Sequence, residues 1–279
     1  MIAHGRDTYV YTCPSHVKFG HNMTIQSIWD TIVDIQRRDG ELPENLYLQL
    51  DNTTRQNKGR YLAAFCELLV AAGIFKLIKV CFLPVGHTHE DIDQFFSRIA
   101  IRLRKHDAWC RKELAYQIRE SYTTKEGRKP LVFHWDSLAH ISGWFKGRNS
   151  DGTKGAPRID MKSSGWMEWR HLQITPGAKT GTAIVKFRRY LSEIKNDAWS
   201  GLNACDAHYS GLKTTPGEFF EALKKRTIPA ASRTKPCQRF LDNRETGIDK
   251  MMSVYGESRF TRAAYNDCLH YEHWLVNHS

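Results

Sequence analysis

The chain has 279 residues, of which 41% are hydrophobic and 11% aromatic, so it can bury the core of one large or two ordinary domains and is not a disordered chain. It lacks both the run of about 20 apolar residues that a membrane span needs and the pattern of a secretory signal, so we expect an intracellular protein, nuclear or cytoplasmic, with no membrane partner. The net charge of +11 is uneven, with +2 in residues 1–105 (13 Lys/Arg, 11 Asp/Glu) and +9 in residues 106–279 (28 and 19), which favours a polyanionic partner such as DNA or another nucleic acid.

The first half of the chain alternates between strand-like and helix-like hydrophobic patterns. A run of β-forming residues predicts a strand over Thr8–Thr12. Apolar residues at helical spacing predict a helix that is capped at Asn22 or Thr24 and ends at Gly40. Leu46–Leu50 is the next predicted strand.

The alternation continues through three more helices and one more strand. A helix is predicted over Gly59–Gly73 and a strand over Lys76–Leu83, whose nearly continuous apolar run indicates burial on both faces. The next helix is capped by Thr88 and its apolar stripe runs to Leu103, and a further helix is predicted over Trp109–Tyr122. Strands that alternate with helices in this way are typical of α/β proteins.

The pattern changes after Tyr122, where tryptophans, glycines and basic residues increase. The predicted organisation is an α/β core over residues 1–122 and a basic, Trp-containing extension of irregular α+β type over residues 123–279. Within that extension Ala183–Phe187 has the composition of a strand and Glu218–Lys225 that of a short helix.

Carboxylates follow or adjoin two of the predicted strands. Asp51 comes directly after the strand that ends at Leu50, and Asp93 lies in the first turns of the helix that follows the next strand. Paired carboxylates at a strand end suit Mg²⁺ or Mn²⁺, and Glu90 or Asp91 could supply a third ligand. The alternative is that Asp51 is a turn residue and that the later acids only stabilise a helix start.

Two further groups of polar residues flank these acids. One consists of His87 and His89, whose H-x-H spacing can bind a transition metal. The other follows Asp51 directly and can contact phosphates or a base, or can simply be solvated. Its members are Arg55, Gln56, Asn57 and Lys58.

Two motifs in this region carry a resemblance to a known family. They are Leu48–Lys58, with LDN and QNK, and Phe82–Asp93, with GHT and a later Asp. Together they resemble an uncharacterised eukaryotic domain family of transposon-derived type over about His4–Tyr122. That family resembles the ribonuclease H-like fold of transposases and integrases, so the resemblance implies a ribonuclease H-like sheet flanked by helices.

The resemblance also implies roles for individual residues. Asp51 matches the second catalytic acid of such enzymes and Asp93 matches the third, so both are expected to be catalytic and to bind Mg²⁺ or Mn²⁺, with Glu90 as a further ligand and His87 and His89 as accessory residues. The two acids are then expected within roughly 8 Å of each other.

The chain departs from that family at its start. The family's first acid lies on a strand upstream of the motif that His4 and Gly5 match, and this sequence has no counterpart of it. We therefore expect a truncated sheet, weak metal binding and little or no nuclease activity. We also expect the Leu46–Leu50 and Lys76–Leu83 strands to be parallel, and the Thr8–Thr12 strand to be antiparallel to its neighbours or at an edge.

Three functions remain open from the sequence. The first is a transposase- or integrase-derived domain whose ancestral reaction is metal-dependent phosphodiester cleavage or strand transfer on DNA. The second is a non-catalytic module that binds nucleic acid or protein, in which the basic second half makes the contacts. The third is a metal-dependent hydrolase of another kind that uses His87 and His89.

Overall fold

The chain forms two compact units, and it passes between them more than once. A computed structural model describes residues 1–13, 20–53, 57–83, 91–108, 110–135, 138–139, 141, 169–178, 181–188 and 200–202. The first unit comprises Met1–Lys18, His89–Ser137 and Ser232–Ser279, and the second comprises Phe19–Thr88 and Leu138–Ala231. Each unit is therefore built from segments that are distant in sequence.

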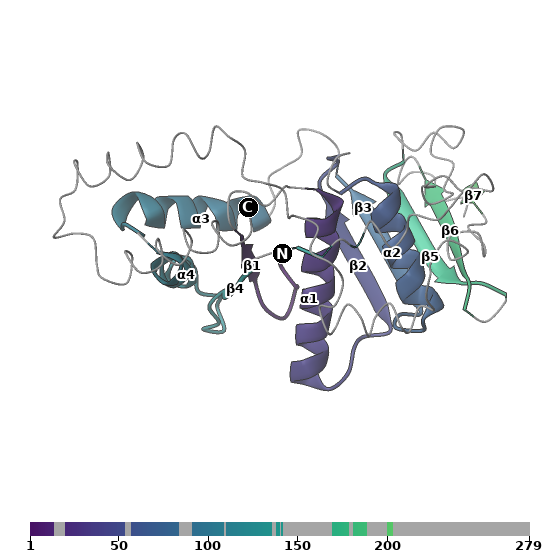
Figure 1. The fold of residues 1–279 in the computed structure, drawn as a ribbon, viewed down its shortest axis with the longest axis horizontal. Helices are drawn as coiled ribbons and strands as arrows, with labels where there is room; N and C mark the ends of the chain where they lie inside the picture. The colour runs from purple at the N-terminus through teal and green to yellow at the C-terminus, as the bar shows by residue number, and fades with distance from the viewer. Residues whose placement is uncertain are drawn as a thin grey trace, which may run out of the picture. The chain divides into compact units, whose positions relative to one another are not determined.

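The second unit contains a mixed five-stranded sheet (Figure 1). In spatial order its strands are β2 (Asn45–Leu50), β3 (Leu77–Phe82), β5 (His171–Pro176), β6 (Ala183–Arg188) and β7 (Ser200–Leu202). The strands β2 and β3 are parallel, as predicted, whereas β3–β5, β5–β6 and β6–β7 are antiparallel. The sheet thus combines a parallel pair with an antiparallel meander.

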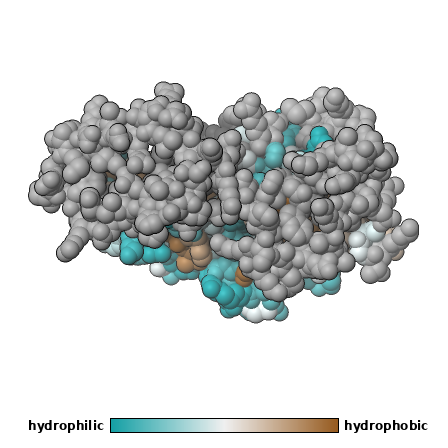
Figure 2. All heavy atoms as spheres, viewed as in Figure 1, coloured by the Kyte–Doolittle hydropathy of each residue, from teal (hydrophilic) through white to brown (hydrophobic). Residues whose placement is uncertain are grey.

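Two helices, α1 (His21–Asp39) and α2 (Arg60–Ala71), lie over one face of this sheet (Figure 1). The stretch from Leu62 to Val70 in α2 is buried throughout, which suits a helix enclosed between the sheet and α1. The indole of Trp29 in α1 meets the ring of Phe65 in α2 edge-on, with centroids 6.4 Å apart. The C-terminal end of α1 is hydrophilic (Figure 2), because Arg37, Arg38 and Asp39 are exposed there.

The ends of these helices follow backbone rules that the sequence partly predicts. Gly40 ends α1 in the left-handed conformation, as predicted. At the end of α2, Gly73 has φ +72° and donates to Val70 O, while Ile74 donates to Leu69 O, which together form a Schellman motif. The predicted caps at Asn22 or Thr24 are wrong, because α1 begins at His21 after Gly20.

The first unit pairs β1 (Tyr9–Thr12) with β4 (Leu131–His134) and adds α3 (Asp91–Lys105) and α4 (Arg111–Glu120). Its described core centres on Phe95, Ile99 and Ile118 from the two helices. The first strand was predicted to be antiparallel to its neighbours or at an edge, and the edge position is confirmed, because β1 pairs only with β4, in parallel, within the described two-stranded sheet. The partner strand lies more than a hundred residues away and had no local signal.

The α/β class and the predicted order of elements up to residue 122 are confirmed in outline. Within the described residues, the predicted strand over Ala183–Phe187 is also present as β6, whereas β4, β5 and β7 were not predicted. The predicted helix over Glu218–Lys225 and the cap at Thr88 lie outside the described residues. None of the described helices has the length and apolar character that a membrane span requires.

Candidate functional site

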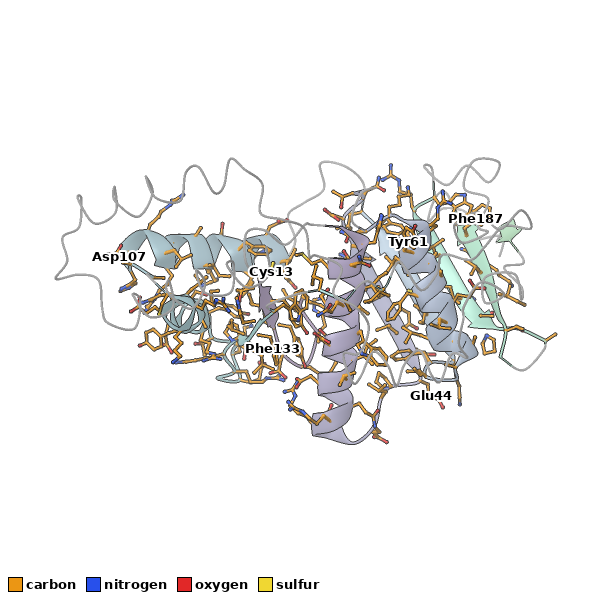
Figure 3. The ribbon with its side chains drawn as sticks, viewed as in Figure 1. Cys13, Glu44, Tyr61, Asp107, Phe133 and Phe187 are labelled. Carbon is orange, nitrogen blue, oxygen red and sulfur yellow. The ribbon has the colours of Figure 1, made fainter. Side chains whose placement is uncertain are left out.

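The carboxyl ends of β2 and β3 form the edge of the sheet where the sequence placed its motifs. Because the two strands are parallel, both end at the same edge, and Leu83 N extends the pairing by donating to Leu50 O at 3.0 Å. Asp51 follows β2 directly. Figure 3 labels Tyr61 at this end of the second unit and Glu44 at the other. In α/β sheets the carboxyl edge is where ligands most often bind.

The carboxylate of Asp51 is exposed and is held in place from one side. Its Oδ1 accepts hydrogen bonds from Thr53 Oγ1 at 2.8 Å and from the side-chain amide of Asn57. Among the described residues no group donates to Oδ2. One oxygen of an exposed carboxylate is therefore anchored, which suits a single-oxygen ligand for a hard cation.

A small network connects this turn to α1. Asn57 Oδ1 accepts from Thr24 Oγ1 at 2.8 Å, so the amide of Asn57 bridges Asp51 and the first turns of α1. The carbonyl of Thr53 also accepts from Asn57 N and Lys58 N, both at 2.9 Å. The turn after β2 is therefore fixed by side-chain and backbone bonds together.

Lys58 lies beneath this turn rather than on the surface. Its side chain is 2% exposed, and its Nζ lies 5.7 Å from the ring centroid of Phe82. Burial, and after it the positive charge of Arg170, lowers the pKa of the Lys58 ammonium to about 8. A lysine buried to this degree cannot contact a phosphate from its present position, so this geometry favours a structural role.

Arg170 reaches the same edge from a distant segment. Its carbonyl accepts from Phe82 N at 2.7 Å, and its Nη1 donates to Leu83 O at 3.3 Å. Arg170 was not predicted, because it follows a long stretch of sequence without a recognisable strand pattern. Thr24 and Thr53 were also missed as members of the network, although their positions near the LDN motif are a usable clue.

Asp93 is exposed in the first turn of α3, and α3 belongs to the first unit whereas Asp51 belongs to the second. The expected separation of roughly 8 Å therefore stays a prediction. Near Asp93, the Asp91 carboxylate lies 4.0 Å from the His4 ring.

Five of the predicted site residues lie outside the described residues. They are Arg55, Gln56, His87, His89 and Glu90. Across the part of the chain that is described, no group of three or more His, Cys, Asp or Glu side chains is placed to hold a metal ion. Asp51 fits one ligand of such a site, and its remaining ligands stay a prediction.

The comparison with known families decides the relationship. A family model described as "Domain of unknown function (DUF7869)" matches residues 1–155, which is more than half of the chain. The chain belongs to this family. No curated protein and no solved structure matches the chain.

The DUF7869 match includes both strands at this edge, Asp51 and Asp93, and it ends before β5. In this chain, the DUF7869 segment of the sheet is therefore completed by strands that follow the matched region.

Proposed function

We propose that this DUF7869 protein is a nucleic-acid-binding domain of ribonuclease H-like, transposase or integrase descent, in which Asp51 and Asp93 are ligands of a Mg²⁺ or Mn²⁺ site. The proposal is supported by the LDN and GHT motifs and by the parallel pair β2–β3 that ends at Asp51. The observation that carries it is the exposed Asp51 carboxylate, with one oxygen anchored by Thr53 and Asn57.

A divalent ion at such an edge would polarise a phosphodiester and activate a water. Asp51 would hold it through Oδ2, and we propose Asp93 and Glu90 as the other ligands. Affinity for a hard cation depends on the number of charged ligands, so binding by this set is expected to be weak. Little or no turnover on DNA is expected for the same reason.

The competing function is a non-catalytic module that binds nucleic acid or protein. It is favoured by the same two hydrogen bonds, because an Asp that accepts from residues 2 and 6 positions later can serve only to fix a turn. The two functions differ in whether the negative charge of Asp51 is needed, or only its oxygen.

Replacement of Asp51 by Asn separates these roles. Asn keeps an oxygen that can accept from Thr53 and Asn57, so the turn is retained while the charge is removed. We expect Asp51→Asn and Asp93→Ala to abolish Mn²⁺ binding measured by calorimetry, with the melting temperature of Asp51→Asn close to that of the wild type. Asp51→Ala removes the acceptor as well and is expected to cost about 0.5–1.5 kcal/mol of stability, because the hydrogen bonds that it loses are exposed.

Asp107→Asn is the matched control, because Asp107 is an exposed acid beyond the end of α3. It should bind Mn²⁺ like the wild type. Unchanged Mn²⁺ binding in Asp51→Asn would reject the metal site in favour of the turn. The same variants are assayed for plasmid cleavage with Mn²⁺, where strong cleavage abolished by Asp51→Asn or Asp93→Ala would show that the expected inactivity is wrong.

A further inference from the structure

One face of the five-stranded sheet carries a row of polar side chains and an exposed aromatic ring. Strand register places Tyr47, Lys79, Gln173 and Lys186 side by side on β2, β3, β5 and β6. We call these four residues the Tyr47 row. With neighbouring strands about 4.8 Å apart, the row spans about 14 Å.

The Tyr47 row lies on the face of the sheet opposite to the buried core residues. Neighbouring positions on the same strands, including Val80, Ile174 and Val185, are buried and point to the helix side. Tyr47 is 64% exposed, Lys79 is exposed, and Gln173 and Lys186 are half-buried. The Lys79 Nζ lies 5.6 Å from the Tyr47 ring centroid, so the cation and the ring are presented together.

The charge on this face has one sign. No Asp or Glu occurs in β2, β3, β5 or β6, whereas Lys79 and Lys186 occupy outward positions. Glu44, just before β2, forms an ion pair with Lys76, just before β3. The face is therefore complementary to a polyanion.

We propose that the Tyr47 row binds single-stranded nucleic acid. A base stacks on the exposed ring of Tyr47, the ammonium groups of Lys79 and Lys186 contact neighbouring phosphates, and Gln173 offers hydrogen bonds between them. Single strands are favoured over duplex because a base must leave its stack to lie on an aromatic side chain. The row is separate from Asp51, which lies four residues, or about 13 Å, further along the strand direction from Tyr47, so it does not depend on the metal site.

The test is fluorescence anisotropy of the full chain with ~12-nucleotide labelled oligo-dT and oligo-U, a length within the usual range of single-strand sites. We expect Tyr47→Ala to weaken binding of either probe by about fivefold to a hundredfold. Tyr47→Phe keeps the ring and should bind within about twofold of the wild type. Lys79→Glu should weaken binding and reduce its dependence on salt.

Two matched controls distinguish the row from general effects. Tyr116, on α4, is 54% exposed, and Tyr116→Ala removes an exposed ring elsewhere. Lys76→Glu changes the net charge by the same amount as Lys79→Glu but lies outside the row. Both should bind more tightly than the matching row variant, and circular dichroism should show that all variants are folded.

Several results would overturn the proposal. One is that the wild type binds no oligonucleotide. Another is that the row variants and their controls lose equal affinity. A third is that a duplex competes with the labelled probe as strongly as a single strand does. Sedimentation velocity supplies one more: a wild-type dimer that Tyr47→Ala dissociates would make this face an interface between two copies of the chain.

Discussion

Glu67 lies in the middle of α2 with its side chain fully buried. Burial raises the pKa of its carboxyl from 4.5 to about 9. The folded chain therefore keeps this proton between about pH 4.5 and 9, where the unfolded chain releases it, so the free energy of unfolding falls as the pH rises through that window. A neutral Glu67 at pH 7 is the consequence.

Glu67→Gln should remove this pH dependence. Gln resembles the protonated carboxyl in shape. The unfolding free energy of the variant is therefore expected to exceed that of the wild type by on the order of 1–4 kcal/mol at pH 8 and to equal it near pH 4. Urea unfolding of both proteins at several pH values measures this difference in unfolding free energy. Glu126→Gln, at an exposed acid, is the control. A wild-type stability that rises from pH 5 to 8 in step with the Glu67→Gln variant would contradict the assignment.

Lys58 has the opposite effect on stability. Its pKa in the folded chain is lowered from 10.5 to about 8, so between these values the unfolded chain binds the extra proton and stability rises with pH. We expect the wild type to gain roughly 1–3 kcal/mol between pH 8 and 10.5 from this group, and Lys58→Met to lose that gain. The check compares the pH slopes of the unfolding free energy from about pH 8 to 10.5 in the wild type, Lys58→Met and, as control, exposed Lys105→Met, because Glu67 contributes equally to all three. Equal slopes in all three proteins would show that Lys58 is not buried as a cation.

The residues around Asp51 differ in how far the sequence predicts their roles. Asp51 was predicted because the acid and the end of its strand are adjacent in sequence. Asn57 was grouped with nucleic-acid contacts, yet its amide joins Asp51 to Thr24, and no spacing rule distinguishes an exposed Asn from a bridging one. Arg170 was not predictable, because it lies more than a hundred residues from Asp51.

At the scale of elements, the hydrophobic core between α1, α2 and the sheet accounts for the successful predictions. The hydrophobic periodicity that predicted α2 comes from the side chains that this helix buries. One of them, Phe65, is fully buried and contacts Trp29 edge-on. We expect Phe65→Ala to cost about 3–5 kcal/mol of unfolding free energy, because it leaves a cavity in this core.

The chain offers a matched control for that substitution. Phe96 in α3 is 58% exposed, so Phe96→Ala should change stability by about 0.5 kcal/mol or less. Urea denaturation of both variants provides the comparison. Equal losses of unfolding free energy in the two variants would mean that Phe65 is not part of a buried core.

Gly73, at the end of α2, is held in the left-handed conformation. Gly73 has φ +72°, and a Cβ there would meet no atom within 4 Å, so substitution costs only backbone strain. Gly73→Ala should destabilise by about 1–2 kcal/mol. Gly20→Ala is the control, because Gly20 is extended and is equally free of neighbours. Thermal melting of the two variants should separate them, and similar melting temperatures would contradict the strain account.

Pairing between distant strands is the part of the fold that the elements alone could not predict. Tyr9 pairs with Leu131 and Cys81 pairs with His171, so each ladder joins segments separated by a long stretch of chain. For β1 the expectation was an antiparallel or an edge position. The strand does lie at an edge, but its parallel partner β4 was not predicted. Local hydrophobic patterns determine whether a strand forms, while its neighbour is chosen by tertiary contacts.

At the scale of the whole molecule, the sheet of the second unit draws β2 and β3 from before residue 122 and β5 to β7 from after it. The basic second half of the sequence thus contributes strands to the same sheet that carries Asp51. The positive charge of Lys186 on β6 is accordingly part of a folded surface, whereas Arg188 on the same strand is buried. The division of the chain at residue 122 stays a prediction.

The net charge of +11 predicts how nucleic-acid binding responds to salt. Each phosphate contact by Lys or Arg releases counterions, so three or four contacts to a single strand would weaken binding roughly 20- to 50-fold between about 50 and 200 mM salt. Because phosphates carry no sequence information, oligonucleotides of different sequence should bind within a few-fold of one another. Anisotropy titrations across this salt range measure both effects. Binding that is insensitive to salt, or that depends strongly on sequence, would show that contacts to bases rather than the excess of Lys and Arg hold the nucleic acid.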